Sequence, residues 1–114
     1  MNKVKFNAKL AELKNFGVEN VMGEFEGSGD SGYVESITYF NADEERIYPG
    51  TAGIELKQFE SYLETNGNIQ EYDWWNNEGG WGSFTFDINT GEFKVDYNIR
   101  IINYEEEKTT KNIL

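Results

Sequence analysis

The sequence has no cysteine, no histidine and a single proline in its 114 residues. Without cysteine the chain has no disulfide bond, no thiolate nucleophile and no thiolate-bound metal, and it suits a reducing compartment. Without histidine it has no imidazole to act as the base for a serine nucleophile. No motif implies a cofactor or a metal, so we expect a non-enzymatic protein that needs neither.

Long apolar runs are missing as well. None approaches the ~20 residues of a membrane-spanning helix, and the first ten residues lack the apolar centre of a signal peptide. We therefore expect a cytoplasmic protein that does not contact membranes. A chain of 114 residues suffices for one domain with its own core. Because 16% of the residues are aromatic, we expect a few large rings to fill that core.

Basic side chains are scarce. The chain has 10 of them against 21 acidic ones, and residues 15–93 contain 16 acidic side chains with only Arg46 and Lys57. A net charge of -11 repels nucleic acid. The same charge attracts basic partners within about one Debye length, ~8 Å at physiological salt. The alternative interpretation is that the charge serves solubility alone.

Two stretches have the apolar spacing of amphipathic helices. Apolar residues at i, i+4 and i+7 predict a first helix over residues 3–16, which Gly17 ends. Apolar residues with similar spacing predict a second helix over residues 54–65, ended by Asn66 and Gly67.

Two other stretches have the alternation of β-hairpins. Residues 18–26 and 33–40 predict a first hairpin around the glycine- and serine-rich turn at residues 27–32. Apolar residues alternate along both arms of residues 73–104, which predicts a second hairpin with its turn at residues 87–92.

The order helix, hairpin, helix, hairpin predicts an α+β fold, with a four-stranded antiparallel sheet and both helices packed on one face. The other sheet face then stays open. We expect one domain over residues 1–104, with a connecting loop at residues 41–53, and a polar C-terminal tail at residues 105–114 that frays.

Acidic residues surround the first predicted turn. The tetrapeptide Gly29-Asp30-Ser31-Gly32 matches the surroundings of the nucleophile in chymotrypsin-like proteases, but that chemistry needs an imidazole base. We therefore interpret it as a hairpin turn. Carboxylates at Glu24, Glu26, Asp30 and Glu35 are of the kind that calcium prefers, although their spacing does not match an EF-hand loop.

Tryptophans crowd the glycine-rich segment at residues 72–82. If exposed, Trp74, Trp75 and Trp81 would anchor a partner or a sugar ring; if buried, they would plug one end of the sheet. The neighbouring acids disfavour nucleic acid and phosphate at this segment. Glycosidases also place acid pairs beside tryptophans, so an acid-pair hydrolase is left as an alternative, although carboxylates are common enough here to produce such a pair by chance.

Two motifs carry a resemblance to a known family. Phe25-Glu-Gly-Ser-Gly-Asp-Ser-Gly32 ends the first predicted strand, and Trp75-Asn-Asn-Glu-Gly-Gly-Trp-Gly82 precedes Phe84-Thr-Phe-Asp87. In these motifs the chain resembles a small bacterial and phage family of unknown function, over residues 18–100. The resemblance implies no activity. It implies that the two glycine-rich loops matter together and meet at one end of the sheet.

These observations lead to one principal hypothesis: an acidic, non-enzymatic protein that binds a basic nucleic-acid-binding protein. The specific form is a phage or mobile-element inhibitor of host defence, of the anti-CRISPR or anti-restriction type. Carboxylates two residues apart on one strand face lie about 6.8 Å apart, a spacing suited to mimicking phosphates. The predicted partner-binding residues are Glu24, Glu26, Asp30, Glu35, Asp43, Glu44, Glu45, Trp74, Trp75, Glu78 and Trp81. The alternative is a small-ligand or calcium-binding module between the Asp30 loop and the loop at residues 76–82.

Overall fold

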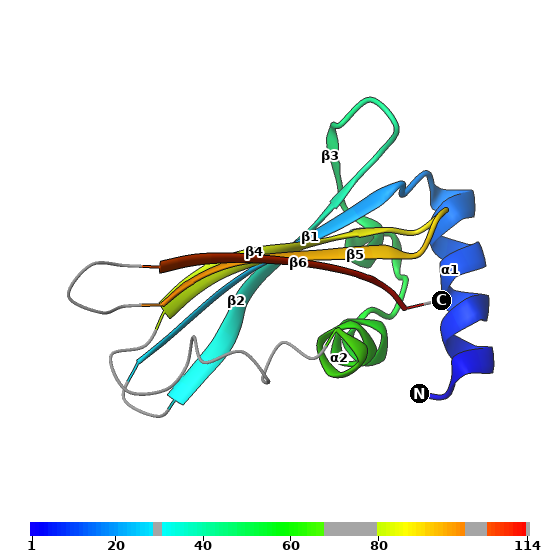
Figure 1. Ribbon diagram of the computed structural model, residues 1–114. Coiled ribbons are helices and arrows are strands. Elements are labelled where there is room, and N and C mark those ends of the chain that lie inside the picture. The colour runs from blue at the N-terminus through cyan, green and yellow to red at the C-terminus, as the bar shows by residue number, and fades with distance from the viewer. Residues whose placement is uncertain (29–30, 68–79, 100–104, 114) are drawn as a thin grey trace.

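The computed structural model describes residues 1–28, 31–67, 80–99 and 105–113. The elements are α1 (Lys3–Phe16), β1 (Asn20–Ser28), β2 (Ser31–Phe40), β3 (Arg46–Ile47), the 3₁₀ helix η1 (Pro49–Ala52), α2 (Lys57–Asn66), β4 (Gly80–Asp87), β5 (Glu92–Ile99) and β6 (Glu105–Asn112). The strands form one twisted sheet, with α2 below one face and α1 across one end (Figure 1).

Within the described residues the sheet has six antiparallel strands, in the order β3-β2-β1-β4-β5-β6. The predicted α+β class with two α-helices is therefore confirmed, and the predicted number of four strands is wrong. Strand β3 contains only two residues and lies inside the predicted loop. Strand β6 lies in the segment that was expected to fray. Strand β6 contains no large apolar residue, so the sequence has no apolar alternation that would predict a strand there. All eight of its residues pair with β5 through the backbone.

Both predicted hairpins form, pairing β1 with β2 and β4 with β5. The first is tighter than predicted, because Gly27 pairs with Gly32 and Ser28 with Ser31. The register shifts between Glu24 and Phe25, which leaves one extra residue in β2 as a β-bulge.

The turn between β4 and β5 follows from Asp87. Its side-chain oxygen Oδ1 accepts hydrogen bonds from the backbone N–H groups of Asn89, at 2.8 Å, and Thr90, at 3.0 Å. The chain then re-enters the sheet through Gly91, which has a φ of 79°. An aspartate that binds the backbone two residues ahead is a common way to close such turns.

The first helix has the predicted bounds, and the second begins later than predicted. In α1 the side chain of Asn2 accepts a hydrogen bond from the backbone N–H of Lys5 at 2.9 Å, and Gly17 ends the helix with a φ of 113°. In α2 the first helical residue is Lys57, and the carboxylate of Glu55 accepts from the backbone N–H of Gln58 at 3.1 Å.

The two helices share one core with the sheet, α2 from below one face and α1 from the end (Figure 1). Phe6 of α1 stacks on Tyr62 of α2 with 4.1 Å between ring centroids, and its ring centroid lies 6.1 Å from that of Phe86 on β4. The buried apolar side chains are Phe6, Leu10, Leu13, Val18, Val21, Phe25, Tyr39, Phe59, Leu63, Phe84, Phe86, Ile88, Phe93 and Val95. Aromatic rings thus form much of the core, as the composition indicates.

Glycine and phenylalanine pair reciprocally between β1 and β4. Gly23 lies opposite Phe84 and Phe25 lies opposite Gly82. A Cβ atom at Gly23 would lie 2.2 Å from the ring of Phe84, and one at Gly82 would lie 2.8 Å from the ring of Phe25. Each ring therefore occupies the space that a side chain would take on the neighbouring strand, so a larger residue at either glycine would force its neighbours to shift.

Candidate functional site

The sheet face opposite the helices carries exposed acids beside an exposed indole. Alternation along β1 turns Glu24 and Glu26 to this side, where both are exposed. The register places Glu26 opposite Trp81 of β4, whose side chain is 39% exposed, and Glu24 opposite Ser83. Directly opposed residues in a sheet have Cβ atoms about 5 Å apart. We call Glu24, Glu26 and Trp81 the open-face patch.

The same face changes character toward β5 and β6. Ser83, Thr85 and the side chains of Lys94, Asp96 and Lys108 border a shallow hollow of about 400 Å³. Lys94 pairs with Glu92 at 3.0 Å and Lys108 pairs with Asp96 at 3.8 Å. These lysines are thus matched by acids on their own or the next strand. The exposed acids of the open-face patch, Glu24 and Glu26, both belong to β1.

Three more predicted binding residues lie in the loop between β2 and β3. Asp43, Glu44 and Glu45 are all exposed. The side-chain oxygen Oδ1 of Asn41 accepts hydrogen bonds from the backbone N–H groups of Asp43, at 3.0 Å, and Glu45, at 2.9 Å. These bonds give the loop a fixed shape with its carboxylates facing solvent.

The structure does not bring this acidic loop to the open-face patch. The loop begins after Phe40, which pairs with Asn20 at the start of β1. Glu26 lies six residues further along β1, which is about 20 Å at the rise of a β-strand. The two groups of acids therefore present separate surfaces.

The side chains of the remaining predicted binding residues are not among those that the structure describes. Asp30, Trp74, Trp75 and Glu78 lie outside the described residues, as does the side chain of Glu35, whose backbone belongs to β2 near the bulge. No group of three or more acidic residues among the described ones is arranged to hold a metal ion. A calcium or ligand site at the Asp30 and 76–82 loops stays a prediction.

The described parts of the two glycine-rich motifs lie side by side. Gly27 of the first motif pairs with Gly80 of the second, and Phe25 pairs with Gly82. The motif residues on β1 and β4 thus meet at the end of the sheet away from α1, as Figure 1 shows. Part of what the motifs specify is the packing of glycine against phenylalanine across these two strands.

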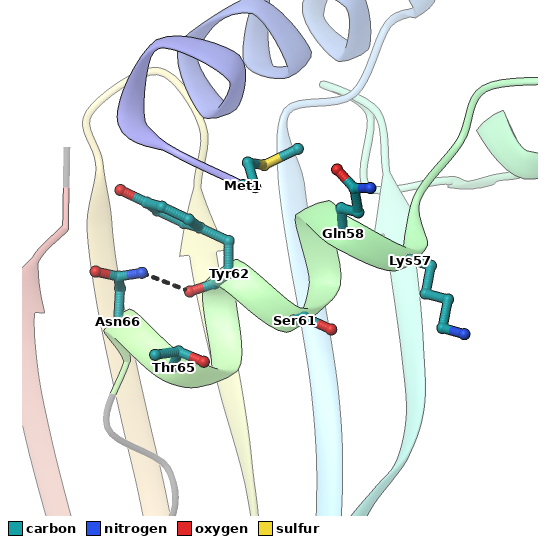
Figure 2. A pocket seen from close by; sticks show the side chains of 7 residues that line it. All are labelled: Met1, Lys57, Gln58, Ser61, Tyr62, Thr65 and Asn66. Carbon is teal, nitrogen blue, oxygen red and sulfur yellow. Dashed lines mark hydrogen bonds between the residues drawn. The ribbon is translucent and has the colours of Figure 1, made fainter.

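A polar hollow of about 470 Å³ lies beside α2, near the N-terminus (Figure 2). Lys57 is the only charged side chain among the seven described residues that line it. Tyr62 stacks on Phe6 and the Asn66 side chain donates to the Tyr62 carbonyl at 2.9 Å, so these two groups serve the packing and the helix end. The hollow brings no reactive pair of side chains together.

A smaller pocket of about 200 Å³ lies where β2, β3, η1 and α2 meet. We call it the Tyr39–Glu60 pocket. Its lining residues are Ile37, Thr38, Tyr39, Arg46, Ile47, Tyr48, Pro49, Gly50, Thr51, Leu56 and Glu60. The buried Tyr39 donates its hydroxyl hydrogen bond to Glu60 Oε2 at 2.6 Å. No sequence pattern links these two residues, which are 21 positions apart in different elements.

Burial dominates the electrostatics of this pocket. It raises the pKa of Glu60, the charge of Glu55 raises it further, and the hydrogen bond from Tyr39 partly offsets both. Burial and then the hydrogen bond and charge of Glu60 raise the pKa of Tyr39 well above its ordinary value, so the tyrosine remains a donor. Burial, followed by the charge of Glu60, also raises the pKa of Glu64.

The raised pKa of Glu60 predicts a stability component that weakens with increasing pH. The folded protein keeps a proton on Glu60 at pH values where the unfolded chain has lost it, so the free energy of unfolding falls as the pH rises from about 4.5 through the folded pKa. Glu60→Gln should remove this component, whereas Glu44→Gln in the exposed loop should leave it unchanged. Urea unfolding at several pH values measures it. A decline with pH as steep in Glu60→Gln as in the unmodified protein would contradict the assignment.

Comparison with known proteins identifies a family over residues 1–110. The model of a family of unknown function, DUF6878, matches residues 1–72 and 62–110. The chain belongs to this family. No curated protein and no solved structure matches it. Membership confirms the predicted resemblance to a family of unknown function, and the family description assigns no activity. None of the helices in the described part of the chain is long and apolar enough to cross a membrane.

Proposed function

We propose that this member of the family is an acidic binding protein, rather than an enzyme, and that its open-face patch contacts a basic surface on a nucleic-acid-binding protein. Occupation of that surface would compete with nucleic acid. The more specific form is inhibition of a host defence nuclease, such as a CRISPR effector or a restriction enzyme.

The observation that carries the proposal is the placement of Trp81 beside Glu26, with Glu24 two residues along the same strand face. Tryptophan is enriched among the residues that anchor protein interfaces. The two carboxylates lie about 6.8 Å apart along β1 and supply charge that steers a basic partner and fixes its orientation. The net charge of -11 acts in the same direction at longer range.

A competition experiment tests the proposal. A panel of purified CRISPR effectors and restriction endonucleases is titrated with the protein in the presence of fluorescent duplex DNA. We expect DNA release from at least one of them, weakening as salt rises, because the Debye length falls from ~30 Å at 0.01 M to ~3 Å at 1 M ionic strength. The double variant Glu24→Lys/Glu26→Lys should compete about tenfold less well, or worse.

Matched variants separate a specific surface from total charge. Glu12→Lys changes the charge as much as Glu24→Lys, but at an exposed position on α1 where the carboxylate contacts Lys9. We expect Glu12→Lys to retain most of the competition and Trp81→Ala to lose it. If Glu12→Lys and Glu24→Lys weakened the competition equally, overall charge rather than a specific surface would account for the interaction. No release of DNA from any panel member would reject the proposed class of partner.

A further inference from the structure

We propose that the Tyr39–Glu60 pocket receives one long basic side chain, lysine or arginine, from a protein partner, with the Glu60 carboxylate as its counter-ion. This adds a second contact, at the β3 edge of the sheet, to the proposed binding of a basic protein. The pocket proposal rests on the proposed function only in naming a basic protein as the partner. The binding of a cation to the pocket is tested below without any partner protein.

The size and walls of the pocket suit a single side chain. Its volume of about 200 Å³ is below the ~300–1,000 Å³ of pockets for drug-sized ligands. Ile37, Ile47 and Leu56 contribute apolar wall, and Glu60 contributes a carboxylate. Lysine and arginine combine an apolar stem with a charged end, which matches this arrangement of surfaces.

The carboxylate of Glu60 has acceptor capacity that its surroundings leave unused. It accepts one hydrogen bond, from Tyr39, and forms no ion pair with a cation in the described ranges. An ionised carboxylate offers about four lone-pair sites. The charge of Glu55 acts on Glu60, and the charge of Glu60 acts in turn on Glu64. The field around this carboxylate therefore favours a cation over an anion.

Among the described residues that line the pocket, Arg46 is the one cationic side chain, and it has another partner. Its guanidinium carbon lies 5.2 Å from the ring centroid of Tyr48, a side chain that is 56% exposed. This distance is that of a cation–π contact. Arg46 therefore lies over Tyr48 rather than in an ion pair with Glu60, and an incoming cation would meet it as a like charge.

The acidic loop adjoins the same edge of the sheet. Arg46 follows Glu45 directly, and Asp43 and Glu44 are exposed just before it. A basic segment with one side chain in the pocket would thus have three carboxylates close to its neighbouring residues. This continuity of charge favours a protein segment with several basic residues over an isolated small cation.

Amino-acid amides test the pocket directly. The probes are N-α-acetyl-arginine amide, N-α-acetyl-lysine amide and the neutral isostere N-α-acetyl-citrulline amide, observed through the methyl NMR signals of Ile37, Ile47 and Leu56. We expect saturable shifts with arginine or lysine, and about tenfold weaker binding of citrulline, because its ureido group is neutral and its hydrogen bond to Glu60 is no longer reinforced by a positive charge. Binding of the cations should weaken as the pH falls and Glu60 takes up a proton.

Three variants decide between a cation and an anion as the occupant. Glu60→Gln keeps the shape and should weaken the cationic probes about tenfold, whereas Glu12→Gln should not change their binding. Arg46→Gln should tighten binding, because it removes a like charge. Weaker binding in Arg46→Gln, equal binding of citrulline and arginine, or no saturable shift of these methyl groups would each overturn the proposal. The citrulline and Arg46→Gln comparisons remain decisive if Glu60→Gln does not fold.

The open-face variants keep this test separate from the proposed function. Glu24→Lys and Trp81→Ala lie on the opposite face from the pocket and should bind the amides as well as the unmodified protein. If Glu60→Gln lost amide binding but still competed with DNA, the pocket would bind a cation without being needed for the competition. Failure of all amides, with DNA competition intact, would reject the pocket and leave the open-face proposal standing.

Discussion

Replacing Phe6 with alanine is expected to lower the free energy of unfolding by about 3–5 kcal/mol. The side chain is fully buried, and its ring contacts Phe59 and Tyr62 of α2, with centroid distances of 5.5 and 4.1 Å, and Phe86 of β4 at 6.1 Å. It is therefore the point where α1, α2 and the sheet meet. A loss of this size is a large part of the ~5–15 kcal/mol that stabilises a typical domain.

Chemical denaturation followed by circular dichroism measures this effect. The matched control is Val4→Ala on the same helix, where the side chain is 77% exposed and the expected change is within ~0.5 kcal/mol. Phe6→Leu should lie between the two, because it keeps much of the buried apolar volume. A change below ~1 kcal/mol in Phe6→Ala would show that α1 does not pack against α2 and the sheet as described.

The second large effect is expected from adding a single methyl group at Gly82. In Gly82→Ala the new Cβ would lie 2.3 Å from the backbone oxygen of Asp96 and 2.8 Å from Tyr97 Cα. A side chain could rotate away from such a contact, but backbone cannot do so without disturbing the pairing of β4 with β5. We expect a loss of about 2–3 kcal/mol, in the upper range for overpacked positions.

Gly50→Ala is the control for this prediction. There the nearest atom to the added Cβ is Leu56 Cδ1, at 3.3 Å, in a side chain that is only partly buried. We expect a change within ~0.5 kcal/mol. Equal thermal midpoints for the two variants would contradict the close approach of β5 to Gly82. Because Gly82 lies between Trp81 and Ser83, the same variant should also disturb the open-face patch.

The parts of the fold that the sequence predicted are those with periodic apolar residues. The helix at residues 3–16 and the hairpin turn at residues 87–92 each combine an apolar pattern with a local signal, Gly17 in one case and Asp87 in the other. Such signals depend on neighbouring residues alone. They require no knowledge of the rest of the chain.

The elements that the sequence did not predict depend on distant contacts. The sequence of β6 is that of a polar segment. It forms a strand because the backbone N–H and C=O groups along the edge of β5 pair with it. Its charged residues suit an edge strand, where they discourage pairing with other molecules. Strand β3 contains two residues, which is too short for any alternation to appear.

The candidate sites show the same division. Alternation in β1 and β4 places Glu24, Glu26 and Trp81 on faces, but only the register between the strands makes Glu26 and Trp81 neighbours. The contact of Tyr39 with Glu60 joins a strand to a helix across 21 residues, so only the packed structure shows it. The predicted partner-binding residues combine the loop acids with the strand acids, but the fold places these two groups at opposite ends of β1.

The central claim is that the open-face patch recognises a basic partner. The most direct measurement is the ¹H–¹⁵N spectrum of the labelled protein with and without a panel member from which it displaces DNA. We predict that the indole N–H signal of Trp81 and the backbone signals of Glu24 and Glu26 shift or broaden, while those of Ala8 and Ala11 on the exposed side of α1 do not. An unchanged Trp81 indole signal in a complex that displaces DNA would contradict the account.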